Sequence, residues 1–198
     1  MKNPPEFYDM EYLHGRMSGA EGAVTRWEDN GLFFTTAMTA RRIASWGDVK
    51  SVLDVGCGRG FVVRHLRNLG MTAKGVEYGK AALAHSVCGA EFGDLTEGLP
   101  VDGREHDLVL CHGVLSHIPT DQVPAALAEL NRVTGKSLWS HILVKYHETQ
   151  RHHRTFASTA WWTIQFNKAG FTIDRELTEL VVDYNRDEYQ WSAVWRRV

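Results

Sequence analysis

The sequence predicts an α/β protein with a doubly wound, mostly parallel sheet, and three observations support this prediction. Short apolar runs bounded by polar residues, at 51–55 and 107–112, have the pattern of buried parallel strands. Segments with apolar residues at helical spacing, such as 59–69, alternate with the strands, which indicates a sheet covered by helices on both faces. A glycine-rich turn joins the first strand to the helix that follows, as expected of a ligand-binding joint.

The other elements follow in the same alternation. Pro124 fits the first turn of its helix, and Ser158 can cap a helix that Gly170 closes. No long helix is expected between the last two strands, which allows an antiparallel hairpin there. Besides the segments already named, we expect strands at 72–77, 137–144, 171–173 and 189–198, and helices at 32–46, 121–133 and 158–169.

The glycine turn is the most informative motif and reads Asp54-Val55-Gly56-Cys57-Gly58-Arg59-Gly60. Its glycines allow a sharp turn and leave backbone amides open to a ligand. A dinucleotide fingerprint would require a glycine where Phe61 stands, and the P-loop pattern G-x-x-x-x-G-K-[ST] is absent. The heptapeptide resembles motif I, D/E-x-G-x-G-x-G, of the class I S-adenosylmethionine-dependent methyltransferases.

Other segments agree with this resemblance in order and spacing. Residues 90–95 are similar to the family's third strand and its following loop, and 113–119 resemble the V-L-x-H-I/V-P sequence after the fourth strand. The resemblance spans 32–198 and implies a Rossmann-like, seven-stranded sheet whose last strand is antiparallel and inserts beside the fifth. It also implies S-adenosyl-L-methionine as cofactor and S-adenosyl-L-homocysteine as product.

The resemblance assigns cofactor contacts to particular residues. Glu77 lies 17 residues beyond Gly60, near the ~20 expected for an acid that binds ribose hydroxyls. Asp94 is the candidate for a contact with the adenine amino group, although aspartate after glycine is also an ordinary turn residue. Arg16 could pair with the cofactor carboxylate, or be an ordinary surface arginine. The full set of expected cofactor-binding residues is Asp54, Gly56, Cys57, Gly58, Gly60, Glu77, Tyr78, Asp94, Leu95, Cys111, Tyr12 and Arg16.

Histidines are the candidate catalytic groups. An oxygen acceptor must lose a proton on methylation, which favours a base with a pKa near the operating pH. His112 ends the fourth strand, at the edge where open α/β sheets bind ligands, and is proposed as general base or substrate orienter. His153 starts an H-x-x-F pattern and is the second candidate base, whereas His117 matches a histidine common to members with different substrates and is expected to be structural.

The histidine-rich loop 147–153 contains residues of the types that bind metal ions. His147, Glu148, His152 and His153 are suitable ligand types, and some family members use a divalent ion to hold a diol or catechol. Their spacing matches no standard zinc motif. We therefore expect no metal ligand among these residues. They are expected to form a solvated polar loop.

The length and composition of the chain indicate a single hydrophobic core. The 198 residues are 43% hydrophobic with a formal charge of −2, so one domain at 32–198 is expected, preceded by an arm and mobile cover at 1–31. No apolar run approaches the ~20 residues of a membrane helix. Three cysteines in separate elements suggest a reducing cytoplasm. We expect a monomer or homodimer with a small-molecule substrate and no membrane or nucleic-acid partner.

The functional prediction is methylation of a small-molecule acceptor, at a hydroxyl of a metabolite or glycan precursor. A nucleic-acid or protein methyltransferase is one alternative, because basic clusters that could form a docking surface occur at Arg41-Arg42, 151–154 and Arg196-Arg197. The D/N-P-P-Y/F signature of the amino methyltransferases of nucleic acid is absent. A non-catalytic cofactor-binding or partner subunit is the other alternative. The sequence names neither the acceptor nor its accepting atom.

Overall fold

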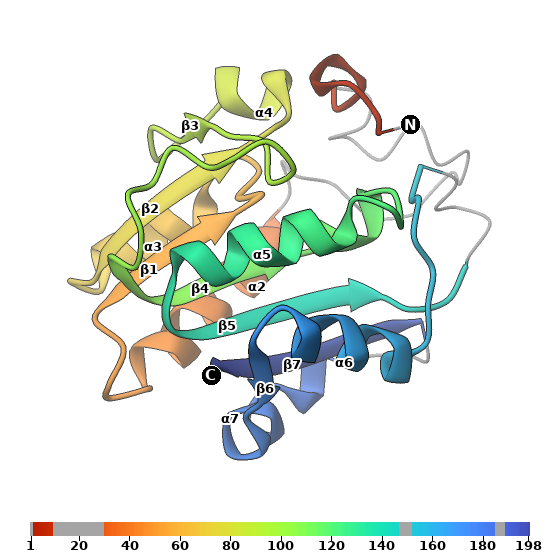
Figure 1. Ribbon diagram of the computed structural model, residues 1–198. Coiled ribbons are helices and arrows are strands. Elements are labelled where there is room, and N and C mark those ends of the chain that lie inside the picture. The colour runs from red at the N-terminus through yellow and green to blue at the C-terminus, as the bar shows by residue number, and fades with distance from the viewer. Residues whose placement is uncertain (1, 10–29, 147–151, 185–188) are drawn as a thin grey trace.

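The computed structural model describes residues 2–9, 30–146, 152–184 and 189–198, which form an α/β fold around one seven-stranded sheet (Figure 1). The strand order is β3-β2-β1-β4-β5-β7-β6. The strands are β1 (Ser51–Val55), β2 (Thr72–Glu77), β3 (Glu91–Phe92), β4 (His106–His112), β5 (Thr134–Leu143), β6 (Phe171–Ile173) and β7 (Gln190–Arg197).

Strand pairing confirms the predicted sheet. β1 pairs in parallel with β2 and β4, β3 pairs in parallel with β2, and β5 pairs in parallel with β4. β7 is antiparallel to both of its neighbours, β5 and β6. The carboxyl ends of β1 to β5 therefore meet at one edge of the sheet, which is where such folds bind ligands.

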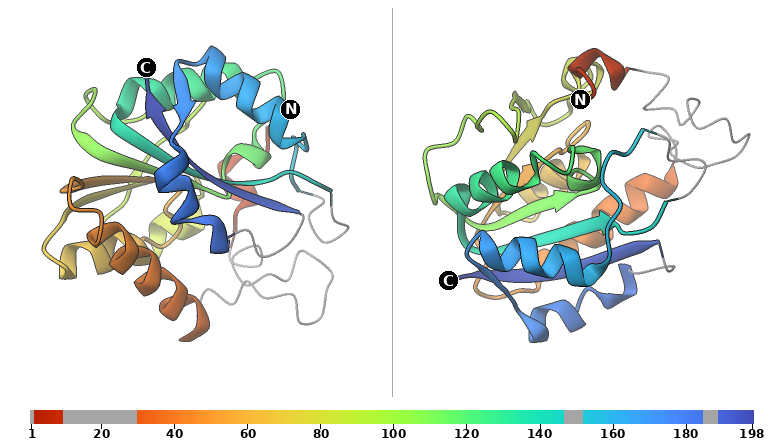
Figure 2. Two further views of the ribbon diagram at one scale, coloured as in Figure 1. Left: turned by 90° about the horizontal axis from the view of Figure 1, so that it is seen from below. Right: turned by 45° about the vertical axis from the view of Figure 1, so that its right-hand side comes forward.

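Helices cover both faces of the sheet, with α5 and α6 on one side and α2 and α3 on the other (Figure 2). Alternate strand residues divide between the two faces: Leu53 packs with the core under α5 and α6, and Val52 with the core under α2 and α3. The helices are α2 (Asn30–Ala44), α3 (Phe61–Asn68), α4 (Lys80–Ala84), α5 (Val123–Val133), α6 (Thr159–Lys168) and α7 (Arg175–Glu179), and the 3-10 turns are η1 (Pro5–Phe7), η3 (Leu115–His117) and η5 (Val182–Tyr184).

Helix ends follow local sequence signals. Gly60 stands before the first residue of α3 with φ of 82°, and Gly70 follows the helix with φ of 81°. Ser158 caps α6, because its Oγ accepts a hydrogen bond from the Trp161 backbone amide at 3.2 Å. These punctuation residues confirm the predicted boundaries of α3 and α6 to within two residues.

Three details differ from the sequence prediction. The third strand is only two residues long and is followed by a turn in which the amides of Glu97 and Gly98 donate to the Asp94 oxygen. The short helices α4 and α7 were not predicted, since five residues give too little periodicity to recognise. Asp174 caps α7 by accepting from the Leu177 amide at 3.1 Å, a signal that was present in the sequence.

Among the described residues, none of the helices combines the length and the hydropathy that a membrane span requires.

Candidate cofactor and acceptor site

The glycine turn leaves β1 in a conformation that only glycine adopts readily. Gly56, Gly58 and Gly60 all have positive φ values, of 74°, 56° and 82°. Space is also restricted, because a Cβ at Gly56 would overlap Cγ2 of Val114 and one at Gly60 would overlap Sγ of Cys88. Gly56 and Gly60 are therefore required for two independent reasons, backbone conformation and close packing, and Gly58 for its backbone conformation.

Glu77 connects the glycine turn to the end of β2. Its Oε2 accepts a hydrogen bond from the Gly58 amide at 2.7 Å, while Oε1 accepts from Tyr78 at 2.9 Å and Gly79 at 2.6 Å. Burial raises the pKa of Glu77, and the three amides act in the opposite direction. The residue predicted to bind ribose thus also holds the motif in shape.

Asp54 lies beneath this turn and is buried, with 6% of its surface exposed. Burial raises its pKa from 3.8 to about 7, and the neighbouring Cys88 and Glu77 act in the same direction. An ionised carboxylate at this position is therefore costly for the folded state at neutral pH.

Asp54→Asn should remove a pH-dependent cost of folding. Because the folded-state pKa is raised, the folded protein retains a proton that the unfolded chain releases, so the contribution of Asp54 is most favourable at low pH and is lost as pH rises to about 7. From about pH 4 to about pH 8, we expect the variant to gain stability relative to the parent, by up to about 4 kcal/mol. Urea denaturation across this range measures the difference, with Asp102→Asn at an exposed position as control; a pH-independent difference for Asp54→Asn would contradict the assignment.

Two cysteines lie against the same part of the turn. A Cβ at Gly75 would be 2.8 Å from Sγ of Cys57 and 3.2 Å from Sγ of Cys88, so both thiols pack against this glycine. A hydrogen bond from Cys57 lowers the pKa of Cys88 to about 6. Cys111, by contrast, is fully buried at the end of β4, and burial raises the pKa of its thiol. The contact of Cys88 with the turn could not be read from the sequence, because Cys88 belongs to no recognised motif.

Asp94 is engaged by groups from the N-terminal segment. Lys2 forms an ion pair with its carboxylate, and Thr96 donates to the same carboxylate through its amide at 2.9 Å and its hydroxyl at 2.7 Å. Burial alone would raise the pKa of Asp94, but Lys2 and Thr96 outweigh it and lower the pKa. Leu95, the next residue, is buried in the core beside α5.

Residues 2–9 lie across the carboxyl edge of the sheet near α4 (Figure 1). Lys2 lies 5.0 Å from the centre of the Tyr78 ring, and the Tyr78 hydroxyl donates to the backbone oxygen of Asn3 at 3.1 Å. Tyr8 packs against Tyr78 with ring centres 6.0 Å apart. The sequence predicted an N-terminal arm but not these contacts, which join residues 70 or more positions apart. Residues 10–29, which include most of the predicted cover as well as Tyr12 and Arg16, lie outside the described residues, whereas residues 30 and 31 of the predicted cover belong to α2.

His112 occupies the predicted position at the end of β4, beside His141 of β5. Its ring packs edge-on against Trp139 at 4.7 Å, and its Nε2 is buried without a hydrogen-bond partner among the described residues. Burial, with a further effect from His141, lowers its pKa to about 3. The expectation of a pKa near the operating pH is therefore wrong for His112, whose imidazole is neutral at pH 7 and suited to orienting a polar group by hydrogen bonding.

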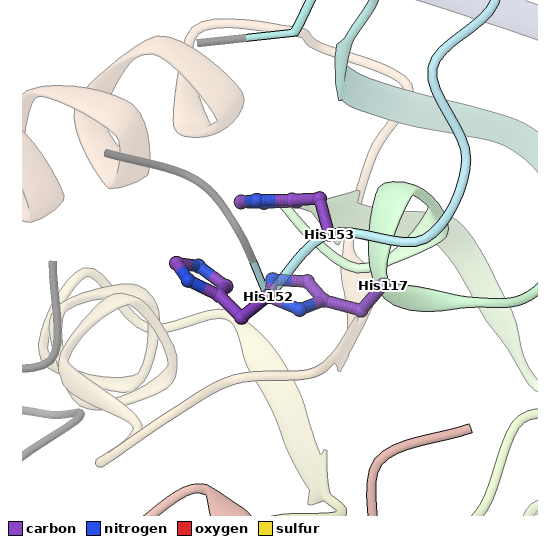
Figure 3. Close-up of side chains that lie close together, drawn as sticks. All are labelled: His117, His152 and His153. Atoms are coloured by element: carbon purple, nitrogen blue, oxygen red, sulfur yellow. The ribbon is translucent and has the colours of Figure 1, made fainter. Parts of the chain in front are cut away.

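His153 is brought together with His117 and His152 (Figure 3). The ring centres are 4.1 Å apart for His117 and His153, 4.4 Å for His152 and His153, and 5.2 Å for His117 and His152. Burial and the neighbouring His153, His152 and Arg154 lower the pKa of His117 well below its usual value. The sequence did not predict this cluster, because His117 was assigned a separate structural role; His147 and Glu148 lie outside the described residues.

Comparison with known proteins agrees with this arrangement. Residues 53–137 match the family model described as "Methyltransferase domain", and the match covers the glycine turn, Glu77 and β4. Residues 53–137, which are less than half of the chain, are therefore similar to a methyltransferase domain.

Particular relatives are similar over part of their length. The chain is 32% identical over 100 residues to the ubiquinone biosynthesis O-methyltransferase of Paraburkholderia xenovorans, covering 44% of this chain and 40% of that protein. It is 33% identical over 105 residues to the protein of the same description from Nitrosococcus oceani, covering 46% and 43%. The match thus spans less than half the length of these curated relatives.

Solved structures share the fold over nearly the whole chain. The magnesium protoporphyrin IX methyltransferase of Synechocystis PCC 6803, crystallised with bound S-adenosylhomocysteine, has a TM-score of 0.69 at 18% identity and covers 98% of this chain and 97% of its own. A [4+2]-cyclase has a TM-score of 0.66 at 18% identity, with coverages of 98% and 94%. Because the second neighbour is described by a different reaction, the fold alone does not define the chemistry.

Proposed function

We propose that this chain is an S-adenosylmethionine-dependent methyltransferase that acts on a hydroxyl group of a small molecule, such as a metabolite or glycan precursor. The observation that carries the proposal is the motif I turn, in which three glycines have positive φ and the Gly58 amide donates a hydrogen bond to the Glu77 carboxylate. The domain match over 53–137 and the O-methylating relatives support it.

The proposed cofactor site follows the carboxyl edge of the sheet from β1 to β4. The glycine turn would pass beneath the methionine part, Glu77 would accept hydrogen bonds from the ribose hydroxyls, and Asp94 with Leu95 would meet the adenine. Asp54 and Cys57 would support the turn, Tyr78 would flank the nucleoside, and Cys111 would close the floor at β4. Tyr12 and Arg16 are retained as proposed contacts to the methionine end.

The proposed acceptor site is reached from the ends of β4 and β5. The cofactor sulfonium makes its methyl group electrophilic, so the protein must align an acceptor oxygen with the methyl-to-sulfur bond and exclude water. We assign the orienting hydrogen bond to the neutral imidazole of His112, whose Nε2 has no partner among the described residues. His153 remains the proposed proton acceptor.

The test is methyl transfer by the purified protein from labelled S-adenosylmethionine into a metabolite extract, read as acceptor labelling and S-adenosylhomocysteine release. We expect His112→Ala to leave the cofactor dissociation constant unchanged and to lower transfer by about 100-fold, the loss expected when an acceptor is misplaced by about 1 Å. His85→Ala, at an exposed position, is the matched histidine control.

Full activity in His112→Ala would place the orienting group elsewhere. Cofactor binding without product formation from any acceptor would contradict the transferase proposal and favour a non-catalytic binding role.

A further inference from the structure

The cluster of His117, His152 and His153 has the composition of a transition-metal site (Figure 3). Each residue offers one ring nitrogen, and the three nitrogens lie within 4.8 Å of one another. Three imidazoles are the ligand set of some catalytic zinc sites, in which a fourth position is open to water or substrate. We propose that His117, His152 and His153 bind one divalent transition-metal ion, of the Zn²⁺ or Co²⁺ type, with a coordination position open to an oxygen ligand.

Hydrogen bonds to the backbone hold the segment that contains His117 beside the segment that contains His152 and His153. The amides of Arg154 and Thr155 both donate to the Ser116 oxygen, at 2.7 and 3.0 Å. The Thr155 hydroxyl donates to the Ile118 oxygen at 2.7 Å. These bonds flank His117 on one segment and His153 on the other, so the imidazoles are brought together by the fold before any ion binds, which lowers the ordering cost of binding.

The surroundings of the cluster also suit metal ligation. His153 is buried, and His117 and His152 are half-buried, which restricts access of bulk water. The Tyr8 hydroxyl lies 3.3 Å from Nδ1 of His117, and an oxygen partner on the second ring nitrogen is the usual way in which a ligating histidine is oriented.

Arg154 opposes a bound dication electrostatically. It adds positive charge near the cluster and contributes to the lowered pKa of both His117 and His152. Its guanidinium is hydrogen-bonded to Asn3 Oδ1, which anchors it to the N-terminal segment. Because the proposed ligands are neutral and no carboxylate is among them, we expect selectivity for metals that prefer nitrogen ligands and no measurable binding of Mg²⁺.

The experiment uses the full chain without an affinity tag, stripped of metal by chelation. Titration with Co²⁺ should produce the visible absorption of a low-coordinate ion, saturating at one equivalent, and Zn²⁺ should displace it. His152→Ala and His117→Gln should each weaken Co²⁺ binding at least tenfold, whereas His85→Ala should leave it unchanged. Mg²⁺ titrated by calorimetry should release no binding heat.

Unsaturable Co²⁺ uptake, or Co²⁺ binding that is unchanged in both His152→Ala and His117→Gln, would overturn the proposal. Both substituted side chains are half-buried, and thermal unfolding checks that each variant is folded. A bound ion would occupy a ring nitrogen of His153, so the proton-acceptor role proposed for this residue applies to the metal-free protein. Metal binding itself does not depend on methyl transfer, and S-adenosylmethionine binding measured on the same samples separates a failed metal site from a failed cofactor site.

Discussion

Replacing Gly56 by alanine is expected to weaken S-adenosylmethionine binding by at least about 100-fold, equivalent to about 3 kcal/mol. The backbone φ of 74° disfavours any L side chain, and the new Cβ would overlap Cγ2 of Val114, so the turn must move away from the position that the cofactor requires. Calorimetry with S-adenosylmethionine or S-adenosylhomocysteine measures the change.

Two further variants separate the causes of this loss. Gly103 has a similar φ of 70° but open space around it, so Gly103→Ala tests backbone strain alone at a position far in sequence from the motif. Adding Val114→Ala to Gly56→Ala removes the overlapping methyl group and should recover part of the affinity. Parental affinity in folded Gly56→Ala would contradict the assignment of this turn to the cofactor.

Replacing Glu77 by glutamine should affect both cofactor affinity and stability. An amide keeps one acceptor oxygen in place of two, so it cannot reproduce the bonds to Gly58, Tyr78 and Gly79 and loses the charge that would favour the ribose hydroxyls. We expect cofactor affinity to fall about 10- to 100-fold and the free energy of unfolding to fall by about 1.5–3 kcal/mol, as for hydrogen bonds to charged groups.

The two readouts distinguish the two roles of Glu77. Denaturant unfolding without cofactor reports the connection between the turn and β2, whereas calorimetry reports the ribose contact. Glu97→Ala, at an exposed position, is the matched control. An unchanged dissociation constant with reduced stability would remove the ribose role and leave a purely structural one.

The main features of the fold could be predicted because they are encoded locally. Strands such as β1 and β4 are apolar runs bounded by polar residues, and Gly60, Gly70 and Ser158 mark helix ends through backbone conformation and side-chain capping. The position of β7 between β5 and β6 came from family resemblance, since no local pattern specifies which strand becomes the neighbour of another. Elements of five residues or fewer, such as α4 and β3, lie below what periodicity can detect.

In the candidate site, too, contacts between residues near in sequence could be predicted and contacts between distant segments could not. The glycine turn and Glu77 are close in sequence, so their spacing predicted a shared location that the Gly58 to Glu77 hydrogen bond confirms. The contact of His117 with His153, and that of Lys2 with Asp94, join distant segments and depend on how loops cross the sheet edge. The low pKa of His112 depends on burial against Trp139, which a position at a strand end does not disclose.

The placement of β7 has a consequence for how the chain reaches its fold during synthesis. β5 and β6 are complete in sequence by residue 173, yet they are not neighbours in the sheet, because residues 190–197 occupy the space between them. Indole groups fasten this late strand: Trp139 donates to the Ser192 hydroxyl and Trp195 to the Ser140 hydroxyl, each at 2.9 Å. In a ribosome-bound chain whose residues 190–197 are not yet available, the edge of β5 is therefore unpaired. The seven-stranded sheet can form only after these residues have left the ribosome.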